Sequence, residues 1–252
     1  MRFYLTHEAN ALGIAYPVIA LYENVSQKKE VSSLYDPAIN DVMSRITDIK
    51  TNILPTKEVQ GFRELIKGLG YSKVEPAGER LLNGCIRKKA FPRYGNLVDA
   101  YNIAGLEYVA GLGVHDAEKL ADVELIFKRA HGTEKMIPSF EENEKIVAKG
   151  DFTYGFNKDG AFVPLAWLGK KDVDNRDFQL KPETKSFILT AIGNMHTSQE
   201  HNIKICERTF ELLKIGCPDV VMKILIPENI KDEQEIKERE VLTASKTEEK
   251  LP

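Results

Sequence analysis

The segment that decides the fold is a helix-forming run, Asn96-Leu97-Val98-Asp99-Ala100-Tyr101-Asn102-Ile103-Ala104-Gly105-Leu106-Glu107-Tyr108. Asn96 is a favourable N-cap residue, and Asp99 is placed to complete a capping-box-like exchange with it. Gly111 and Gly113 lie just beyond the run, where glycine commonly ends a helix. The pattern therefore predicts a capped helix over residues 96–108.

The sequence before this helix predicts a strand followed by helices. Residues 12–22 are rich in β-forming side chains and are interrupted by Pro17, so we expect one strand or two short ones. Over residues 36–69, apolar residues recur at helical steps, with Asp36 as a candidate N-cap and Pro37 at the first helical position. Pro55 marks a break in that region. Residues 75–82 predict a turn that leads into a further helix.

The sequence after the helix predicts strands and one closing helix. Residues 123–127 read as a strand that is buried on both sides, and residues 151–167 as a hairpin around an Asp159-Gly160 turn. Residues 187–192 predict a buried strand and residues 203–213 a helix. We therefore expect one compact α+β domain over residues 1–227. Residues 228–252 are rich in Glu and Lys, which predicts a solvated helix or a disordered tail from Glu228 onward.

Composition excludes several classes of protein. Of the 252 residues, 42% are hydrophobic and 29% charged, and no apolar run is long enough to cross a membrane. The first eight residues reach a charge too soon for a signal peptide. Three widely spaced cysteines favour reduced thiols in a cytoplasmic protein. The net charge of −3 argues against a protein that coats nucleic acid, and we expect no DNA partner.

Common catalytic and cofactor motifs are absent from the sequence. It contains no phosphate-binding loop, zinc-protease helix, nucleophile elbow or dinucleotide-binding glycine pattern. The five histidines lie far apart, which does not favour a metal site. We therefore expect neither a metal nor another cofactor. The oligomeric state stays open, because the sequence shows no coiled-coil heptad repeat.

Several weak motifs in a consistent order resemble those of the B3/B4 domain family. The resemblance begins with the Glu75-Pro76-Ala77-Gly78-Glu79 turn and continues through the helix that carries Val98-Asp99-Ala100-Tyr101-Asn102. It goes on to the glycine-rich turn, the Lys119-Leu120 step, the Asp159-Gly160 turn, Trp167 with Lys170 and Lys171, and Pro182-Glu183-Thr184. Together these motifs span about residues 40–215.

The B3/B4 domain carries the editing site of the phenylalanyl-tRNA synthetase β subunit. The resemblance implies a β-sandwich-like core of unusual topology flanked by helices. It also implies a stand-alone editing protein that hydrolyses, in trans, the ester between a wrong amino acid and the 3′ end of a tRNA. Such an ester is labile, so the site needs to hold the ligand and orient a water more than it needs a strong nucleophile. The tRNA would be a transient partner, and no membrane is involved.

The same resemblance nominates residues of the central helix and the following turn. Asn102 matches a pocket asparagine and is the first catalytic candidate, since its amide can donate to a carbonyl or hold a water. Tyr101 stands where the synthetase has a pocket threonine, and it is otherwise a core aromatic. Asp99 is a ligand candidate or simply a helix cap. His115 is a second catalytic candidate, although a gapless match from Asp99 places Gly113 at the family's histidine position.

The remaining candidates lie further along the chain. Trp167, Lys170 and Lys171 are candidates to stack on and neutralise the tRNA end, or they form a half-buried tryptophan beside a basic loop. Thr184 is either a ligand contact or a residue that fixes a turn. Thr190 lies in the strand that, in the family, commonly finishes with a substrate-binding glutamate, and residues 187–193 contain no acid here.

This missing acid keeps three hypotheses open. The first is a deacylase for mischarged tRNA, and the second is a module of the same fold that binds an aminoacyl-adenosine-like ligand without hydrolysing it. The third is an adaptor that uses the charged tail from Glu228 onward. The neutral Thr190 also argues against tyrosine or phenylalanine analogues as the amino acid recognised.

Overall fold

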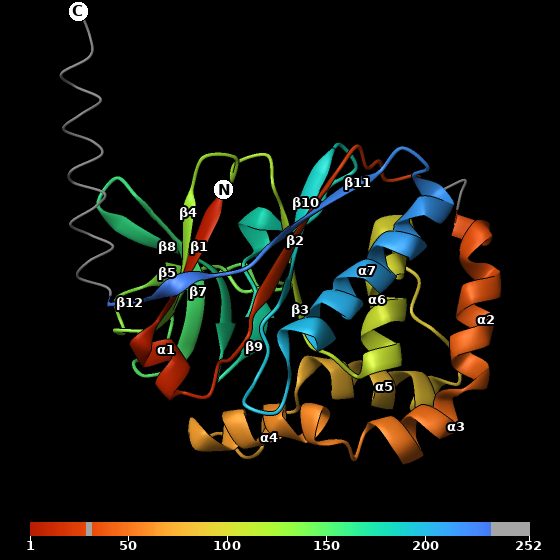
Figure 1. Cartoon of the computed structure of the whole chain (residues 1–252), viewed down its shortest axis with the longest axis horizontal. Coiled ribbons are helices and arrows are strands. Elements are labelled where there is room, and N and C mark those ends of the chain that lie inside the picture. Colours follow the sequence, from red (N-terminus) through yellow and green to blue (C-terminus); the bar gives the residue numbers. More distant parts are fainter. Residues whose placement is uncertain (29–31, 233–252) are drawn as a thin grey trace, which may run out of the picture.

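The computed structural model describes residues 1–28 and 32–232, and its framework is two β-sheets that face each other (Figure 1). The larger sheet runs β12(Glu228–Lys231), β1(Arg2–Thr6), β4(Glu124–Arg129), β7(Phe152–Lys158), β8(Ala161–Leu168), β9(Asp172–Asp174). The smaller sheet runs β11(Val221–Leu225), β2(Val18–Glu23), β10(Ser186–Ala191), β3(Leu112–Asp116). This mixture of helices and packed sheets confirms the predicted α+β class with a β-sandwich-like core.

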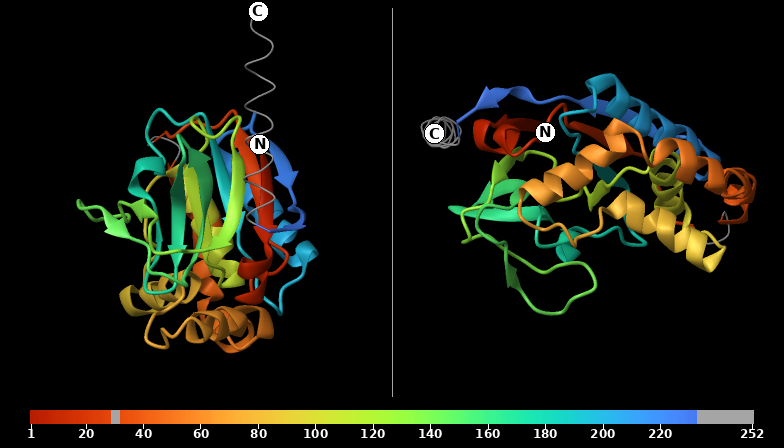
Figure 2. Two further views of the ribbon diagram at one scale, coloured as in Figure 1. Left: turned by 90° about the vertical axis from the view of Figure 1, so that its left-hand side faces the viewer. Right: turned by 90° about the horizontal axis from the view of Figure 1, so that it is seen from below.

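Helices cover the outer face of the smaller sheet and one end of the sandwich. The outer face is covered by α6(Asn96–Tyr108) and α7(Gln199–Gly216), and α2(Asp36–Ser44) packs against α6. The lower end in Figure 1 is covered by α4(Lys57–Gly68) and α5(Ala77–Lys88). The short elements are α1(His7–Ala11), η1(Ser32–Tyr35), α3(Ile46–Asp48), η2(Ile49–Ile53), β5(Lys135–Met136), β6(Lys145–Ile146) and η3(Arg176–Phe178). In the right-hand view of Figure 2, α5 and the β5–β6 segment lie on the side opposite α7 and β11.

Strand β10 is the buried strand that the sequence predicted at residues 187–192, and in the structure it is buried on both faces. Phe187, Leu189 and Ala191 pack into the core that the smaller sheet shares with the helices. Ile188 and Ile192 pack into the other core, between the two sheets. Because successive side chains of a strand point to opposite faces, an apolar residue at nearly every position is what a sheet covered on both sides requires.

The predicted central helix is confirmed as α6, but its caps are not the predicted ones. Gly95 is the N-cap residue, and the helix ends before Val109, which has a left-handed backbone with φ of 50°. Asn96 is buried and is used elsewhere, since its Oδ1 accepts a hydrogen bond from Lys28 N at 2.9 Å. Asp99 is also fully buried and accepts from the Tyr94 amide at 2.8 Å, which holds the turn before the helix.

Other predicted elements agree with the structure in type and differ at their ends. The hairpin is confirmed as β7 and β8, joined by Asp159 and Gly160 with φ of 50° and 77°. Of residues 12–22, only those after Pro17 form a strand. Asp36 is the first helical residue and caps nothing with its side chain, because Tyr35 occupies the N-cap position. The break near Pro55 separates η2 from α4.

The two ends of the described chain meet in the larger sheet. Strand β1, which the sequence did not predict, pairs in parallel with β4 and with β12. Residues 228–231 therefore belong to the sheet, whereas the sequence predicted that the solvated tail begins at Glu228. Residues 233–252 of that tail lie outside the described residues. Among the helices in the described part, none is both long enough and apolar enough to cross a lipid bilayer.

Helices α4, α5 and α6 are fixed to one another by one ion pair and one close backbone approach. Arg63 of α4 donates from Nε to Oε2 of Glu79 at 2.7 Å, and Glu79 is 1% exposed. Gly78 of α5 faces the turn after α6, where an added Cβ would lie 2.3 Å from the carbonyl oxygen of Val109. A side chain larger than hydrogen does not fit there without moving one of the two helices.

Replacing Gly78 by Ala tests this approach, with Gly84→Ala as the matched control on the same helix. A Cβ at Gly84 would meet no atom within 4 Å, so alanine there should leave the packing intact and raise helix propensity. We expect Gly78→Ala to destabilise the fold by about 1–3 kcal/mol. We expect Gly84→Ala to be neutral or to stabilise by up to about 1 kcal/mol. Urea unfolding curves measure both changes, and equal effects of the two substitutions would contradict the close approach.

Candidate functional site

A cleft of about 1000 Å³ opens where the edges of the two sheets meet. Strand β3 is the edge of the smaller sheet and β9 the edge of the larger one, and both contribute to its wall. Helices α5 and α6 form the opposite side, and residues near the β5–β6 segment and the β8–β9 turn complete the rim. The volume lies at the upper end of the range for small-molecule and cofactor sites.

Tyr101 and Asn102 enter the cleft from the middle of α6. Both are half-buried, and each projects from a helix whose other face is packed against the core. The amide of Asn102 makes no hydrogen bond with any described residue, so its donor and acceptor atoms are available to a ligand. Burial raises the pKa of the Tyr101 phenol, which therefore stays protonated at neutral pH and can donate a hydrogen bond.

Two carboxylates of β9, Asp172 and Asp174, face the same cleft. Asp172 Oδ2 accepts a hydrogen bond from the Ala77 amide at 2.5 Å and lies 4.0 Å from the Arg80 guanidinium. Asp174 Oδ2 accepts from the Val114 amide at 3.1 Å, which satisfies an outward-facing N–H of edge strand β3. Burial raises the pKa of Asp172, and burial together with the neighbouring Asp172 charge raises the pKa of Asp174 to about 7.

His115 lies behind this wall and does not reach the cleft. It is fully buried in β3, and its Nε2 is 2.7 Å from the hydroxyl of Tyr154 and 3.8 Å from Asp174 Oδ1. Burial lowers the pKa of His115 to about 3, so the imidazole is neutral at physiological pH. The structure thus gives His115 the position of a buried support for Tyr154 and separates it from Asn102, the other predicted catalytic residue.

Cationic side chains gather on the outer part of the cleft. Lys171 pairs with Glu141, and Arg80 donates to the Asp172 carbonyl oxygen at 3.1 Å. A further three, the exposed side chains of Arg87, Lys88 and Lys170, form no ion pair with any described residue. The cleft therefore has unneutralised positive charge at its rim and carboxylates on its inner wall.

Two aromatic side chains at the cleft are largely exposed. Tyr94 is 63% exposed and Phe140 is 96% exposed, which is unusual for aromatic residues that have no ligand or partner to cover them. Aromatic faces next to cationic side chains are a common arrangement for holding unstacked nucleic-acid bases.

Of the residues nominated from the sequence, the structure brings together four and places the others elsewhere. Tyr101, Asn102, Lys170 and Lys171 line the cleft. Trp167 is buried and donates from Nε1 to Asp151 at 2.6 Å, in the wall of a smaller inner pocket. His115 lines none of these cavities, and neither do the three remaining nominated residues, Asp99, Thr184 and Thr190.

Two of those outlying residues, Thr184 and Thr190, are buried away from the cleft. Thr184 donates to Asp116 and accepts from the Lys181 amide at 2.9 Å, which fixes the turn before β10. Thr190 is fully buried in β10, close enough to the Tyr154 hydroxyl to influence its pKa. Neither threonine is exposed to a ligand in the cleft.

Asp172, Asp174, Tyr94 and Phe140 were not found by sequence reasoning. The two acids alternate along a strand, and that spacing puts them on one face. It does not reveal which cavity the face borders, because β9 reaches the cleft only through its place at the edge of the larger sheet. Nothing in the local sequence distinguishes Tyr94 or Phe140 from other aromatic residues.

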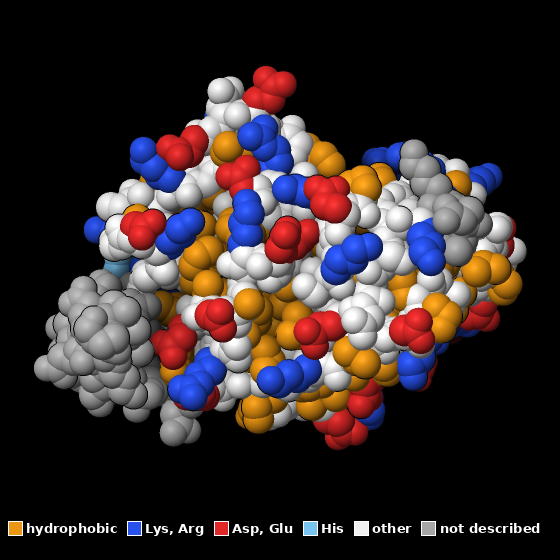
Figure 3. Space-filling model, turned by 90° about the horizontal axis from the view of Figure 1, so that it is seen from above, with side chains coloured by type: hydrophobic (Ala, Val, Ile, Leu, Met, Phe, Trp, Pro, Cys, Tyr) orange, Lys and Arg blue, Asp and Glu red, His pale blue; other side chains and the backbone are white. Residues whose placement is uncertain are grey.

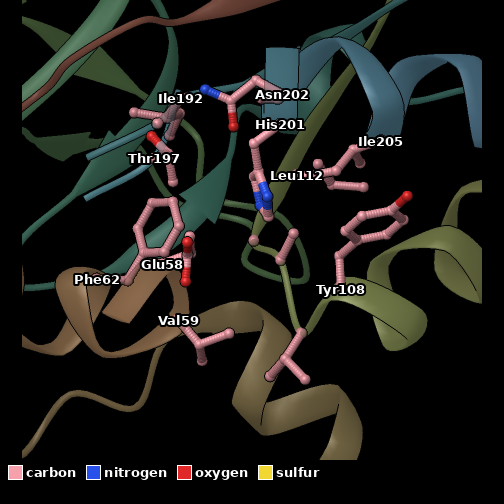
Figure 4. A pocket seen from close by; sticks show the side chains of 15 residues that line it. Glu58, Val59, Phe62, Tyr108, Leu112, Ile192, Thr197, His201, Asn202 and Ile205 are labelled. Carbon is pink, nitrogen blue, oxygen red and sulfur yellow. The ribbon is translucent and has the colours of Figure 1, made fainter. Parts of the chain in front are cut away.

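Two smaller cavities and the outer surface offer weaker sites. The pocket in Figure 4, where His201 of α7 lies beside Tyr108 of α6, has a volume of about 10 Å³, room for one water at most. The inner pocket that includes Trp167 measures about 30 Å³. On the face shown in Figure 3, basic and acidic side chains are interspersed, without a uniform basic area. The described residues contain no cluster of three or more metal-ligating side chains.

The raised pKa of Asp174 makes the stability of the fold depend on pH. The carboxyl has a pKa of about 7 in the folded protein and an ordinary value of 3.8, so between these values the folded state holds a proton that the unfolded chain releases. Stability should therefore fall as pH rises through this window and stay level above it. In Asp174→Asn this part of the decline should be absent.

Thermal melts of the wild type and Asp174→Asn, at about pH 5 and about pH 8, measure this difference. We expect the wild type to lose at least about 2–4 °C more than the variant between the two conditions. Parallel pH profiles would show that the Asp174 carboxyl is not destabilised by its surroundings.

Comparison with known proteins finds matches among solved structures but none among curated proteins. One matching structure is the N-terminal fragment of the phenylalanyl-tRNA synthetase β subunit from Pyrococcus horikoshii, at 11% sequence identity and a TM-score of 0.47. The match covers 92% of this chain and 52% of that fragment, so the chain spans about half the length of the solved relative.

The family comparison is more direct, because it rests on the sequence pattern itself. The model of the B3/4 domain matches residues 64–203, which is more than half of the chain. The matched region includes α5, α6, β3 and β9, the elements that form the cleft. The protein therefore belongs to the B3/4 domain family.

Proposed function

We propose that the cleft binds the 3′ end of a mischarged aminoacyl-tRNA and hydrolyses the ester that joins the amino acid to the terminal adenosine. The observation that carries the proposal is the placement of Asn102 and Tyr101 opposite two carboxylates, with unpaired cations at the rim of one cleft. Membership of the B3/4 domain family supports it, since the B3/B4 domain carries the editing site of the phenylalanyl-tRNA synthetase β subunit.

The separation of charge in the cleft suits such a ligand. An aminoacylated tRNA end is anionic along its phosphates and cationic at the amino acid. Arg87, Lys88 and Lys170 are placed to contact phosphates, and the carboxylates of β9 lie deeper, where the amino acid would sit. Tyr94 and Phe140 offer faces on which the terminal bases can stack.

The chemistry requires a positioned water more than a reactive side chain. Water attacks the ester carbonyl, and the tetrahedral intermediate then releases the 3′ oxygen of the adenosine, which takes up the proton that the water gives up. The amide of Asn102 can donate to the oxygen that becomes negative in this intermediate, or it can hold the water. The products are the free amino acid and a tRNA with a free 3′ hydroxyl group.

A second function, binding without hydrolysis, is favoured by one observation. Among the described residues no histidine lines the cleft, and His115 is buried behind its wall and neutral. A site of this kind would hold an aminoacyl-adenosine-like ligand and leave the ester intact. The two functions differ only in whether ester is lost, which makes them easy to separate.

A deacylation assay with several mischarged tRNAs, to which the protein is added in trans, tests the proposal. We expect loss of at least one ester faster than spontaneous hydrolysis, and we expect Asn102→Ala to lower kcat by about a hundredfold or more. The matched control is Asn52→Ala, which removes an exposed asparagine outside the cleft and should leave the rate unchanged.

The outcomes separate the two functions. Full activity in Asn102→Ala, with an unchanged circular dichroism spectrum, would exclude Asn102 from the site but leave hydrolysis standing. No ester loss with any tRNA would favour the binding module, and a filter-binding assay with the same tRNAs would then measure its ligand.

The cations at the rim of the cleft also predict how tRNA binding depends on salt concentration. In the double variant Arg87→Ala, Lys88→Ala, we expect weaker tRNA binding at low salt. We also expect the slope of the logarithm of the binding constant against the logarithm of the salt concentration to become less steep by about 0.7 for each phosphate that the protein no longer neutralises. Lys67→Ala is the control, because Lys67 is equally exposed on α4 but lies outside the cleft. Equal effects in the control and the double variant would mean that the tRNA does not contact this rim.

A further inference from the structure

We propose that the Asp174 carboxylate binds the α-ammonium group of the amino acid, so that the cleft accepts aminoacyl esters with a free amino group and rejects N-acylated ones. This inference rests on the proposed function, since it names the chemical class of ester that the same cleft takes. It concerns Asp174, which was not among the residues nominated from the sequence. The surroundings of that side chain point to this role.

Asp174 has no cationic partner in the described part of the protein. Its carboxylate accepts one hydrogen bond, from the Val114 amide at 3.1 Å, and no Lys or Arg nitrogen of a described residue lies within 4.0 Å of it. A buried carboxylate is ordinarily paired or hydrogen-bonded several times. The side chain is nevertheless 27% exposed, and it lines the cleft, so a ligand can reach it.

The groups that face Asp174 from neighbouring elements cannot supply the missing charge. His115 of β3 lies 3.8 Å away and is neutral, and Tyr154 of β7 is an un-ionised phenol whose hydroxyl is 2.7 Å from that histidine. Tyr101 of α6 is another protonated phenol. Arg80 of α5 approaches Asp172 instead, at 4.0 Å. A cationic group on the ligand would therefore be the first positive charge to neutralise the Asp174 carboxylate.

The position of Asp174 is fixed, which binding of a small cation requires. Its carbonyl oxygen accepts from Ser139 N at 2.8 Å and from Ser139 Oγ at 2.9 Å. Gly113 allows the approach of β9 and β7, because a Cβ there would lie 1.9 Å from the Tyr154 hydroxyl and 3.4 Å from Asp174 Oδ1. The carboxylate is thus held at one place on the wall facing Tyr101 and Asn102.

An α-ammonium group matches this site, and an N-acylated amine does not. The ammonium group offers a full charge and up to three N–H donors to a carboxylate in a partly dry site, where such bonds are strong. Acylation removes the charge, leaves one N–H and adds a group that must fit against the same wall. Peptidyl and N-acetyl esters should therefore bind and react less well than free aminoacyl esters.

A matched pair of substrates tests the inference: the same tRNA charged with one amino acid, either free or N-acetylated. For the wild type we expect kcat/KM to favour the free amine by about tenfold to a hundredfold, the effect of one hydrogen bond between charged groups. In Asp174→Asn the preference should largely disappear through slower reaction of the free amine. In Asp174→Glu part of it should return.

The ratio of the two rates is measured within one preparation, so partial unfolding of a variant cancels. Equal rates for both esters in the wild type, or an Asp174→Asn variant that slows both equally, would overturn the inference and leave the proposed hydrolysis intact. If no ester is hydrolysed at all, the proposed hydrolysis fails by itself. The same comparison is then made by titration calorimetry with amide-linked aminoacyl-adenosine and its N-acetyl form, where equal affinities would overturn the inference.

Discussion

Burial of the smaller sheet on both faces is the constraint on which the rest of the structure depends. Strands β2 and β10 carry two apolar faces, one against the helices and one against the larger sheet. Neither face can be left in water, so the helical layer and the larger sheet must both form. The cleft opens at the edge where β3 and β9 meet.

The polar groups at this edge are buried to different degrees, and the burial of each group decides its role. His115 is wholly enclosed, and burial keeps its imidazole neutral by lowering its pKa. Its Nε2 forms a hydrogen bond with the Tyr154 hydroxyl. Asp174 sits one layer further out, partly dry and partly exposed, where it satisfies an edge-strand amide and retains an uncompensated carboxyl group. Asn102 lies across the cleft on a rigid helix. Fixed dipoles and charges around one cleft are suited to holding a small, charged ligand.

The site could be predicted in part, because part of it is local in sequence. Tyr101 and Asn102 are consecutive on a helix that the pattern of residues 96–108 identifies, and the family motif marks the same pair. Asp174 lies far from them along the chain and joins them only through the pairing of β8 with β9 and the packing of β3 beside it. His115 was nominated from its place near the glycine-rich turn, yet alternation along β3 turns its side chain toward Tyr154 between the sheets.

Hydrophobic period and turn residues act over a few neighbouring positions. For this reason the α+β class, the central helix, the Asp159-Gly160 hairpin and the buried strand near residues 187–192 could be predicted from the sequence. Tertiary structure alone decided the helix caps, the use of Asn96 to bind the Lys28 amide, and the incorporation of residues 228–231 into the larger sheet. It also decided which polar side chains share the cleft. These features depend on partners distant in the chain, and the free energy that selects them comes from packing and desolvation that no local pattern records.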